Sequence, residues 1–376
     1  MLTVGLDVHQ AVTVACVLDE GGATRETKTI RGGWEQVVAW VGGLGDGVRV
    51  CFEASVGYGP LHDGLARVAR RVVVAHPGQV RLIFRSKQKH DRADAKKLAT
   101  LLFLDQVPPV HVPRADVRGW RSLIEHRRRL IDRRTKTKNG LRAALRTAGV
   151  RPIKPGHWLW TRAGLSWLAS VELPSDAECC RRDVLIAELD HFERLIGLVT
   201  TRLDKLAADH PGIALLMTIP GVGPRTAEAI VAYIDDPHRF SSVRKVGSFF
   251  GLVPKQSQSG GRNHLGRITK SGSGTVRKLL VEAAWSAARW CEPAKAFFER
   301  VCRGDQDRRK IATIALAHKL LRMMLAMLRS GETCRWAAVR CSSTTTDSDS
   351  RAIASTQRQT CIMCGTVHLI PHSGGG

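Results

Sequence analysis

The sequence contains few acidic residues, few aromatic residues and no long apolar run. Its 34 Asp and Glu residues stand against 58 Lys and Arg residues, which gives a formal net charge of +24 at neutral pH. An excess of this size opposes a compact state unless a polyanion offsets it, so the composition indicates a nucleic-acid partner. Because no apolar run has the length that a bilayer requires and no signal peptide is recognisable, we expect no membrane partner.

A disulfide framework is missing as well. The ten cysteines are scattered through 376 residues without regular spacing, so we expect a reducing, cytoplasmic compartment. Cys361 and Cys364 have the spacing of half a zinc ribbon, but a single pair of this kind also occurs in loops that bind no metal. Both interpretations stay open for this pair.

The first 107 residues alternate between strand-like and helix-like segments. The expected order is strand 2–8, strand 10–18, strand 23–30, helix 34–41, strand 48–52, helix 58–69 and strand 71–75. Turn-forming residues separate the first strands, whereas the later strands alternate with helices. This pattern predicts an α/β domain in which helices pack on a mixed sheet, in the manner of RNase H-like nucleases.

Four carboxylates in this region have positions that suit one site. Asp7 and Glu53 close predicted strands, and Asp91 and Asp94 lie three residues apart on one face of a predicted helix. Clustered carboxylates repel one another unless a cation neutralises them, and oxygen ligands of this kind select Mg²⁺ or Mn²⁺. Two such ions would clamp a phosphodiester. The alternative is structural, with the helix pair favouring its N-terminus and the other two serving as turn or surface acids.

The next region, residues 114–209, is predicted to be helical and strongly basic. Apolar residues recur at near-heptad spacing along 116–147, and a second long helix is expected over 182–209. The two helices predict a coiled coil, formed within the chain or between copies in a homo-oligomer. Charge of one sign at this density favours nucleic-acid contact over a merely solvated face. The arginines assigned to this contact are Arg127, Arg128 and Arg134.

The segment Ile219-Pro220-Gly221-Val222-Gly223 predicts a tight turn that leads into a helix beginning near Pro224. Backbone N–H groups at a helix start bind anions, which is how a helix-hairpin-helix holds a DNA phosphate. A turn without any DNA contact is the alternative. The residues assigned to the DNA contact are Gly221, Gly223 and Arg225.

Ser259 precedes two glycines and is followed by a basic segment. A hydroxyl beside flexible backbone and surrounded by cations is what attack on a phosphodiester needs, because cations hold the substrate and stabilise the developing negative charge. A Ser-Gly-Gly sequence is more often an ordinary loop, so this interpretation depends on the basic surroundings and on the carboxylates upstream. The residues assigned to phosphate contact are Arg262, Arg267, Lys270 and Arg277.

Taken together, these motifs resemble those of the "IS one-ten" group of insertion-sequence transposases, in which a RuvC-like DEDD domain precedes a domain with a catalytic serine. The matching motifs are Gly5-Leu6-Asp7-Val8, Phe52-Glu53, Asp91-Arg92-Ala93-Asp94-Ala95, Pro220-Gly221-Val222-Gly223, Gly251-Leu252-Val253-Pro254, Ser259-Gly260, Gly266-Arg267-Ile268-Thr269-Lys270 and Arg277. The resemblance implies that Asp7, Glu53, Asp91 and Asp94 are the metal-binding DEDD set. It also implies that Ser259 is the recombination nucleophile, which forms a phosphoserine link to DNA.

The resemblance further implies that the partners are DNA, both at the element ends and at the target, and a non-coding guide RNA. It implies a homo-oligomer, a dimer or tetramer, in the bacterial cytoplasm and associated with the nucleoid. The chain departs from the family pattern at two positions. Gln258 precedes Ser259 where the family often has a second hydroxyl residue, so Ser257 is the fallback nucleophile. Ser273 stands where the family usually has Asn.

The expected architecture is a RuvC-like α/β domain, a helical coiled-coil connector, and a mainly α domain with a helix-hairpin-helix. The expected boundaries are 1–107 for the first domain, 114–209 for the connector, 210–335 for the serine domain and 336–376 for a low-complexity tail. The predicted function is a DNA transposase or site-specific recombinase. One alternative is a metal-dependent nuclease resembling a Holliday-junction resolvase, in which the DEDD site cuts alone. Another is a non-catalytic nucleic-acid-binding protein.

Overall fold

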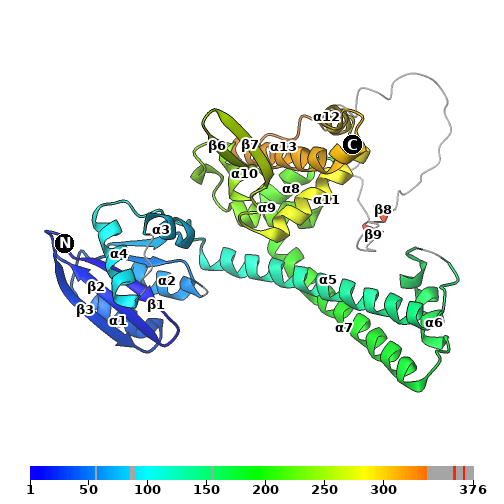
Figure 1. The fold of residues 1–376 in the computed structure, drawn as a ribbon, viewed down its shortest axis with the longest axis horizontal. Helices are drawn as coiled ribbons and strands as arrows, with labels where there is room; N and C mark the ends of the chain where they lie inside the picture. The colour runs from blue at the N-terminus through cyan, green and yellow to red at the C-terminus, as the bar shows by residue number, and fades with distance from the viewer. Residues whose placement is uncertain (56, 85–89, 155, 337–358, 361–366, 369–376) are drawn as a thin grey trace, which may run out of the picture.

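The computed structural model describes residues 1–55, 57–84, 90–154, 156–336, 359–360 and 367–368. Figure 1 shows an N-terminal α/β domain, a long helical hairpin and a C-terminal helical domain. The prediction of an α/β region followed by a mostly helical part is confirmed. Most of the predicted low-complexity tail lies outside the described residues, and so do Cys361 and Cys364.

One mixed sheet forms the centre of the N-terminal domain. Its strands are β1 (Thr3–Val8), β2 (Val12–Leu18), β3 (Thr24–Arg31), β4 (Arg49–Glu53) and β5 (Arg71–Ala75), in the spatial order β3-β2-β1-β4-β5. Short turns join β1, β2 and β3 into an antiparallel meander, whereas β4 and β5 follow helices and therefore run parallel to β1. This arrangement is the mixed sheet that the strand pattern predicts.

Helices cover both faces of the sheet. They are α1 (Trp34–Gly42), α2 (Tyr58–Val68), α3 (Pro77–Ile83) and α4 (Asp91–Phe103). On one face, Leu6 belongs to a buried cluster with Val37 of α1 and Leu65 of α2. On the other face, Cys16 belongs to a buried cluster with Ala95 of α4. The core therefore has two layers, and α4 forms one of them directly over β1 and β2.

The closest approach between helix and sheet occurs at Gly5. A Cβ atom built there would lie 2.2 Å from the Ala95 carbonyl oxygen and 2.3 Å from the Ala99 backbone nitrogen, so only glycine fits. β1 and α4 are therefore in direct backbone contact. Because Asp7 follows Gly5 on β1 and Asp91 begins α4, this contact brings the two carboxylates toward one another.

The segment after α4 extends the edge of the sheet. The Val110 N–H donates to the Val74 carbonyl over 2.8 Å, and the His76 N–H donates to the Pro108 carbonyl over 2.9 Å. The linker of residues 104–114, which contains Pro108, Pro109 and Pro113, thus begins as part of the sheet edge beside β5.

A hairpin of two long helices, α5 (Ala115–Thr147) and α7 (Asp176–Ala207), follows the linker. Figure 1 shows the two helices side by side, with α6 (Arg162–Ser170) at the tip. The 3-10 turn η1 (Trp158–Trp160) also belongs to the tip, where Leu159 and Leu168 are buried with side chains of α5. The structure therefore pairs two long helices within one chain, and their description as a coiled coil stays a prediction.

The C-terminal domain is built on a helical core. Its helices are α8 (Pro211–Met217), α9 (Pro224–Ile234), α10 (Lys245–Phe249), α11 (Gly274–Trp290), α12 (Glu292–Cys302) and α13 (Arg309–Ser330), with the 3-10 turns η2 (Pro237–Arg239) and η3 (Gln306–Arg308). Ile230, Leu280 and Leu320, from α9, α11 and α13, are fully buried in one cluster.

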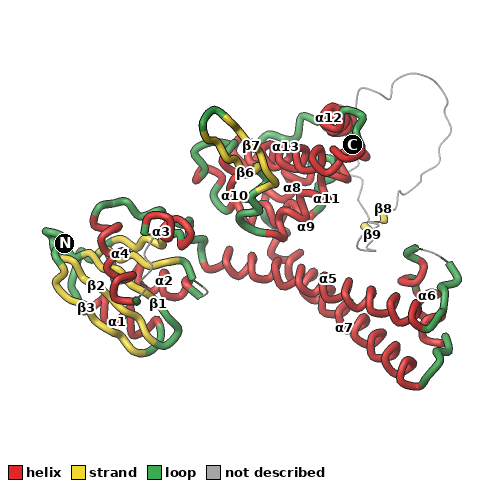
Figure 2. Tube along the Cα trace, viewed as in Figure 1, coloured by secondary structure: helices red, strands yellow, loops and turns green. Residues whose placement is uncertain are grey.

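A two-stranded hairpin, β6 (Pro254–Ser259) and β7 (Arg262–Ile268), is part of the same domain. Figure 2 shows it as a strand pair beside the helices. This hairpin was not predicted from the sequence, because most of its residues are polar and its strands bury no apolar face. Farther along the chain, β8 (Gln359–Thr360) pairs with β9 (Val367–His368).

The segment Gln306–Ser330, which contains α13, is long and apolar enough to cross a membrane by composition alone, with a mean hydropathy of 1.6 in an 18-residue window. Half of that window is buried inside the protein. Leu316, Leu320 and Met324 are fully enclosed by the C-terminal domain. The helical core therefore accounts for the apolar character of this segment.

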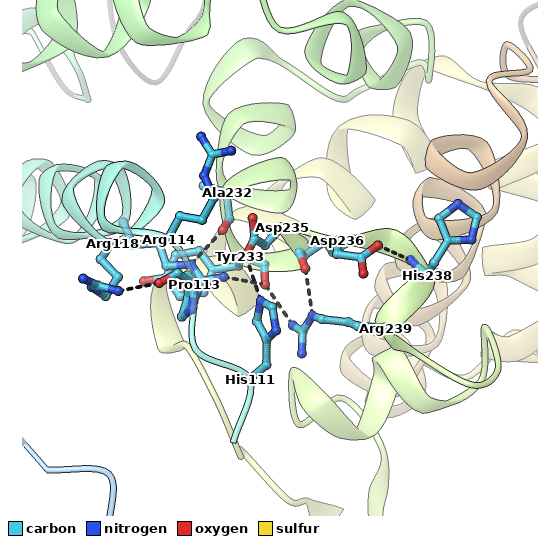
Figure 3. Close-up of polar contacts among 12 residues, drawn as sticks. His111, Pro113, Arg114, Arg118, Ala232, Tyr233, Asp235, Asp236, His238 and Arg239 are labelled. Carbon is cyan, nitrogen blue, oxygen red and sulfur yellow. Dashed lines mark hydrogen bonds and ion pairs between the residues drawn. The ribbon is translucent and has the colours of Figure 1, made fainter. Parts of the chain in front are cut away.

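The start of α5 is attached to both flanking domains. Arg118 forms an ion pair with Asp63 of α2, while Arg121 Nε donates over 2.7 Å to a carbonyl in the last turn of α9. His111 Nε2 and Asp235 Oδ2 lie 2.7 Å apart in the same junction (Figure 3). These contacts tie the linker and α5 to the C-terminal domain as well as to the sheet domain.

Candidate active site and nucleic-acid interface

The structure brings Asp7 and Asp91 together and adds a histidine between them. His9 Nε2 lies 3.4 Å from Asp7 Oδ2 and 3.8 Å from Asp91 Oδ2. In the part of the chain that the structure describes, this is the one group of three or more acid, histidine or cysteine side chains whose ligand atoms all lie within 4.8 Å of one another. Two carboxylates and an imidazole in this arrangement can hold a divalent cation.

The electrostatic environment of Asp7 makes this group one that a cation would stabilise. Burial raises the pKa of Asp7; His9 opposes this effect, but the negative charges of Asp91 and Asp94 add to it. The net result is a pKa above the ordinary value for Asp. A bound cation would relieve the repulsion among the three carboxylates.

Glu53 and Asp94 lie near this group without belonging to it. The parallel register of β1 and β4 places Asp7 and Glu53 at equivalent steps of adjacent strands. Asp94 pairs with Lys97 of its own helix at 2.7 Å, while its charge still acts on Asp7. The assignment of Glu53 and Asp94 to a metal-binding set stays a prediction.

His9 is a residue that the sequence analysis missed. The available signal was its position two residues after Asp7, since residues two apart along an extended segment point to the same side. The proximity of His9 to Asp91 depends on the contact of α4 with β1, which spacing alone does not reveal.

Ser259 lies at the tip of the β6–β7 hairpin. It pairs with Arg262 across a two-residue turn in which Gly260 and Gly261 have φ angles of +53° and +79°. Two successive positive φ angles are typical of a type I′ turn, which glycine adopts without strain. The Gly-Gly sequence therefore makes a tight turn that fixes Ser259 opposite Arg262.

Both candidate nucleophiles share one face of this hairpin. Ser257 pairs with His264 and Ser259 pairs with Arg262, and alternate residues of a strand point to the same side. Every residue of β6 is exposed, so both hydroxyl groups are accessible. Ser259 has a guanidinium directly across the hairpin, which suits phosphate chemistry better than the imidazole opposite Ser257.

The predicted phosphate contacts around the hairpin fall into two groups. The exposed ones are Arg262, Arg267 and Lys270. Arg277 instead donates to the carbonyl oxygens of Phe250 and Gly272, over 3.2 Å and 3.1 Å, and burial lowers its pKa. Arg277 therefore holds together the loop that precedes α11, and its contact with phosphate stays a prediction.

The loop from Ile219 to Gly223 joins α8 to α9, which is the arrangement that a helix-hairpin-helix requires. Gly221 has a φ angle of +89° and faces inward, because a Cβ atom built there would lie 2.5 Å from the Ala287 backbone nitrogen of α11. Gly223 is exposed at the N-cap of α9, with open space around it. Of the two glycines, Gly223 is therefore the one placed for an anion contact.

Arg225, which was assigned to the same DNA contact, is engaged within the protein. It pairs with Glu228 Oε2 at 2.9 Å and with Asp204 of α7. Glu228 is 1% exposed, and burial raises its pKa despite the opposing charge of Arg225. Arg225 thus stabilises a buried carboxylate, and a DNA contact for it stays a prediction.

The arginines assigned on α5 make intramolecular contacts. Arg127 Nε donates to Thr200 Oγ1 over 2.7 Å, and Arg134 pairs with Glu193 of α7 at 3.0 Å. Arg128 lies 2.9 Å from a carboxylate of its own helix. The exposed basic residues of the same stretch are Arg129, Arg133 and Lys136. These neighbours are better placed to meet a polyanion than the assigned residues.

Glu125 is a second residue that the sequence analysis missed. It accepts hydrogen bonds from the hydroxyl groups of Tyr233 at 2.5 Å, Thr275 at 2.7 Å and Ser273 at 3.0 Å. Burial acts to raise its pKa, but these three hydrogen bonds and the positive charge of Arg129 together lower it. Glu125 therefore joins α5 to α9 and to the start of α11. Ser273, which departs from the usual Asn of the family, has a structural partner here.

Comparisons with known proteins agree with this layout. Residues 4–149 match the IS110-type DEDD transposases, and residues 213–299 match the family described as "Transposase IS116/IS110/IS902 family". A probable family 20 transposase of Pseudomonas aeruginosa is 30% identical over 251 residues, which cover 65% of this chain and 73% of the relative. The chain belongs to the IS110/IS116/IS902 transposase family.

Two further relatives of this transposase extend the comparison. The transposase for insertion sequence element IS1111A of Coxiella burnetii is 28% identical over 343 residues, covering 89% of this chain and 91% of the relative. The pilin gene-inverting protein of Moraxella lacunata is 32% identical over 146 residues, covering 38% of this chain and 43% of the relative. The chain is therefore an insertion-sequence transposase, an enzyme of DNA transposition that binds DNA, and its DEDD domain implies the use of a divalent metal.

Proposed function

We propose that this transposase cuts and rejoins DNA through Ser259, assisted by divalent metal held at Asp7, Glu53, Asp91 and Asp94. The observation that carries the proposal is the position of Ser259 opposite Arg262 across a tight glycine turn. The hairpin exposes every residue of its first strand and has no apolar face that packs on its own domain. Its tip is therefore available to a substrate.

In the proposed reaction, the Ser259 hydroxyl oxygen attacks a DNA phosphorus atom. A phosphoserine ester forms while the bond from phosphorus to the leaving DNA oxygen breaks, and the proton lost by the serine balances the one gained by that oxygen. The guanidinium of Arg262 stabilises the negative charge that develops on the phosphate oxygens. Attack by a hydroxyl of a different strand end then reverses the chemistry, which joins the new strand and releases Ser259.

The donor set at Asp7 fits a divalent cation because it combines carboxylate oxygens with mutual repulsion that only a positive charge relieves. When bound, Mg²⁺ or Mn²⁺ would supply positive charge next to the scissile phosphate. The strand order β3-β2-β1-β4-β5, with acids near the ends of β1 and β4, supports an RNase H-like assignment for this domain.

The hairpin and the carboxylates lie in different parts of one chain (Figure 1). We infer that Ser259 of one copy approaches the carboxylates of another, so that the active form is a homo-oligomer, a dimer or tetramer. Val184, Leu198 and Leu206 are exposed apolar residues along α7, and they support a contact between copies.

Two polyanions are proposed as partners, namely the DNA and a non-coding guide RNA. The formal charge of +24 supports this proposal, as do the two separate exposed basic surfaces on α5 and on the β6–β7 hairpin. Gly223, at the start of α9, adds a backbone site for a phosphate.

A metal-dependent nuclease resembling a Holliday-junction resolvase is the second candidate. The observation that favours it is that Asp7, His9 and Asp91 assemble within one domain, without any part of the C-terminal domain. Under this reading Ser259 has no chemical role. Family membership argues against the third alternative, a non-catalytic nucleic-acid-binding protein.

The two candidates separate in a plasmid assay that scores both cleavage at the element ends and joining to a target. Under the serine mechanism, Ser259→Ala abolishes cleavage and joining together, while the matched variant Ser257→Ala retains both. Under the nuclease mechanism, Ser259→Ala still cleaves at the wild-type rate, and only the carboxylate variants lose cleavage.

A further inference from the structure

His9 lies where a ligand of the carboxylate site would lie. Its Nε2 atom is 3.4 Å from Asp7 Oδ2 and 3.8 Å from Asp91 Oδ2. Both separations exceed the roughly 2.7–3.2 Å of an ordinary N–H···O hydrogen bond. Two ligand atoms bound at about 2.1 Å to one octahedral cation are about 3.0 Å apart when adjacent and about 4.2 Å apart when opposite. Both His9 separations lie between these two values, as expected for side chains arranged around a space that a cation would occupy.

The three side chains also leave room for a cation and its waters. The side chains of His9 and Asp91 are 55% and 56% exposed, whereas that of Asp7 is 22% exposed. Asp7 is thus the fixed inner ligand at the end of β1, and His9 and Asp91 form the open side of the site. Water molecules can complete the coordination shell from that side.

We infer that His9 is an imidazole ligand of the Asp7–Asp91 site and that it makes this site prefer Mn²⁺ to Mg²⁺. The inference rests on the proposed metal-dependent function and goes beyond it, because the DEDD set contains carboxylates alone.

The preference follows from ligand chemistry. Mg²⁺ binds oxygen ligands and keeps much of its water, so an imidazole nitrogen contributes little to its affinity. Imidazole suits first-row transition ions better than it suits Mg²⁺; Mn²⁺ is the weakest binder of that series, but like Mg²⁺ it also accepts the two carboxylates of the set. A single histidine among carboxylates therefore raises the affinity for Mn²⁺ more than that for Mg²⁺.

The test is a Mn²⁺ titration of the full chain, free of any histidine tag and followed by electron paramagnetic resonance, with Mg²⁺ as competitor. We expect His9→Ala to weaken Mn²⁺ binding by about tenfold or more and Mg²⁺ binding by less than about threefold. We also expect a pulsed spectrum of the wild-type complex to show coupling of Mn²⁺ to an imidazole nitrogen, which His9→Ala removes.

The matched control is His62→Ala, because His62 Nδ1 also lies near a carboxylate, 3.2 Å from Asp63 Oδ1, in the same domain. This variant keeps both affinities and the nitrogen coupling. Circular dichroism of His9→Ala checks that the domain is still folded, which the exposure of His9 leads us to expect.

The possible outcomes distinguish a failure of the role of His9 from a failure of the metal site itself. If Asp7→Asn abolishes Mn²⁺ binding but His9→Ala leaves affinity and nitrogen coupling unchanged, the metal site stands and the role of His9 is wrong. If wild type and Asp7→Asn bind Mn²⁺ equally weakly, both the metal site and the inference fail.

Discussion

Glu125 and Asp7 of this transposase are both partly buried, but the protein shifts their pKa values in opposite directions. Three hydroxyl groups donate to Glu125, and together with the charge of Arg129 they lower its pKa against the effect of burial. Asp7 is subject to burial and to the charges of Asp91 and Asp94, which raise its pKa despite His9. At Glu125, the fold itself supplies the hydrogen-bond donors that stabilise the negative charge. At Asp7, the neighbouring carboxylates leave an excess of negative charge that a bound cation would neutralise.

This difference in pKa shift distinguishes a carboxylate with a structural role from one with a functional role more clearly than sequence motifs do. A carboxylate that accepts hydrogen bonds from protein donors contributes to stability, because the folded state favours its charged form. Carboxylates that face one another across an open site cost stability, and a fold retains them for a ligand. On this basis Glu125 holds the architecture together, whereas Asp7 fits the active site that we propose.

The sharpest way to test this comparison is Asp7→Asn. Removing one charge from a repelling group leaves the fold intact, so the melting temperature is expected to stay the same or rise slightly. Cleavage and joining are expected to fall by about a thousandfold or more, equivalent to about 4 kcal/mol of transition-state stabilisation. Thermal melting and the plasmid assay measure the two quantities. A large loss of stability with activity retained would assign Asp7 to the structure.

The second largest effect is expected from Gly5→Ala, which breaks the backbone contact that assembles the carboxylate site. The new Cβ would lie 2.2 Å from the Ala95 carbonyl oxygen, so α4 must move away from β1. We expect a loss of about 3 kcal/mol in the free energy of unfolding together with loss of activity. Urea denaturation measures the first. Gly119→Ala, on a helix with open space around it, is the control and should not destabilise.

Glu125→Ala is expected to affect stability and to reduce activity only through it. The change leaves three hydroxyl groups without their shared acceptor and should cost about 2 kcal/mol, measured by urea denaturation. Asp132→Ala serves as the control, since Asp132 also lies 3.5 Å from Lys278 of α11 but is 50% exposed. An exposed pair of this kind should cost less than about 1 kcal/mol. Equal costs for the two variants would contradict the special position of Glu125.

The smallest effect concerns pH. The pKa of Glu125 is lower in the folded state than in the unfolded state, so its charged form stabilises the fold. This stabilisation is complete at pH values above the unfolded pKa of about 4.5. That stability is lost as the pH falls through the lowered folded pKa. We therefore expect the wild type to exceed Glu125→Gln in unfolding free energy by about 1 kcal/mol at neutral pH. The difference should shrink below about pH 4.5. A constant difference across this range would be inconsistent with a charged Glu125.

The sequence alone was sufficient to predict the elements that have a periodic pattern of apolar residues. The strand pattern of residues 1–107 predicted the mixed sheet, and the heptad-like spacing of 116–147 predicted the paired long helices. Asp7 and Asp91 lie close together, as expected for a strand end and a helix start at one end of a sheet, and their role as metal ligands stays a prediction.

The remainder depends on contacts between distant residues. The hydroxyl partners of Glu125 follow it by 108 to 150 residues, and no local pattern predicts such a meeting. The intramolecular pairing of Arg134 with Glu193 was hidden for the same reason, since a basic run looks alike whether its residues face a partner helix or solvent. The β6–β7 hairpin is a local feature, but its strands lack the alternation of apolar and polar residues by which a strand is recognised in a sequence.

The central claim is that Ser259 becomes covalently attached to DNA. The most direct measurement is to trap the protein–DNA adduct from full-length protein with the element's end sequences, its non-coding RNA and divalent metal, and to locate the modified residue by mass spectrometry after digestion. The account predicts a phosphodiester-linked nucleotide on Ser259, absent from Ser259→Ala and from Asp7→Asn. An adduct on Ser257, or DNA cleavage without an adduct on either serine, would contradict it.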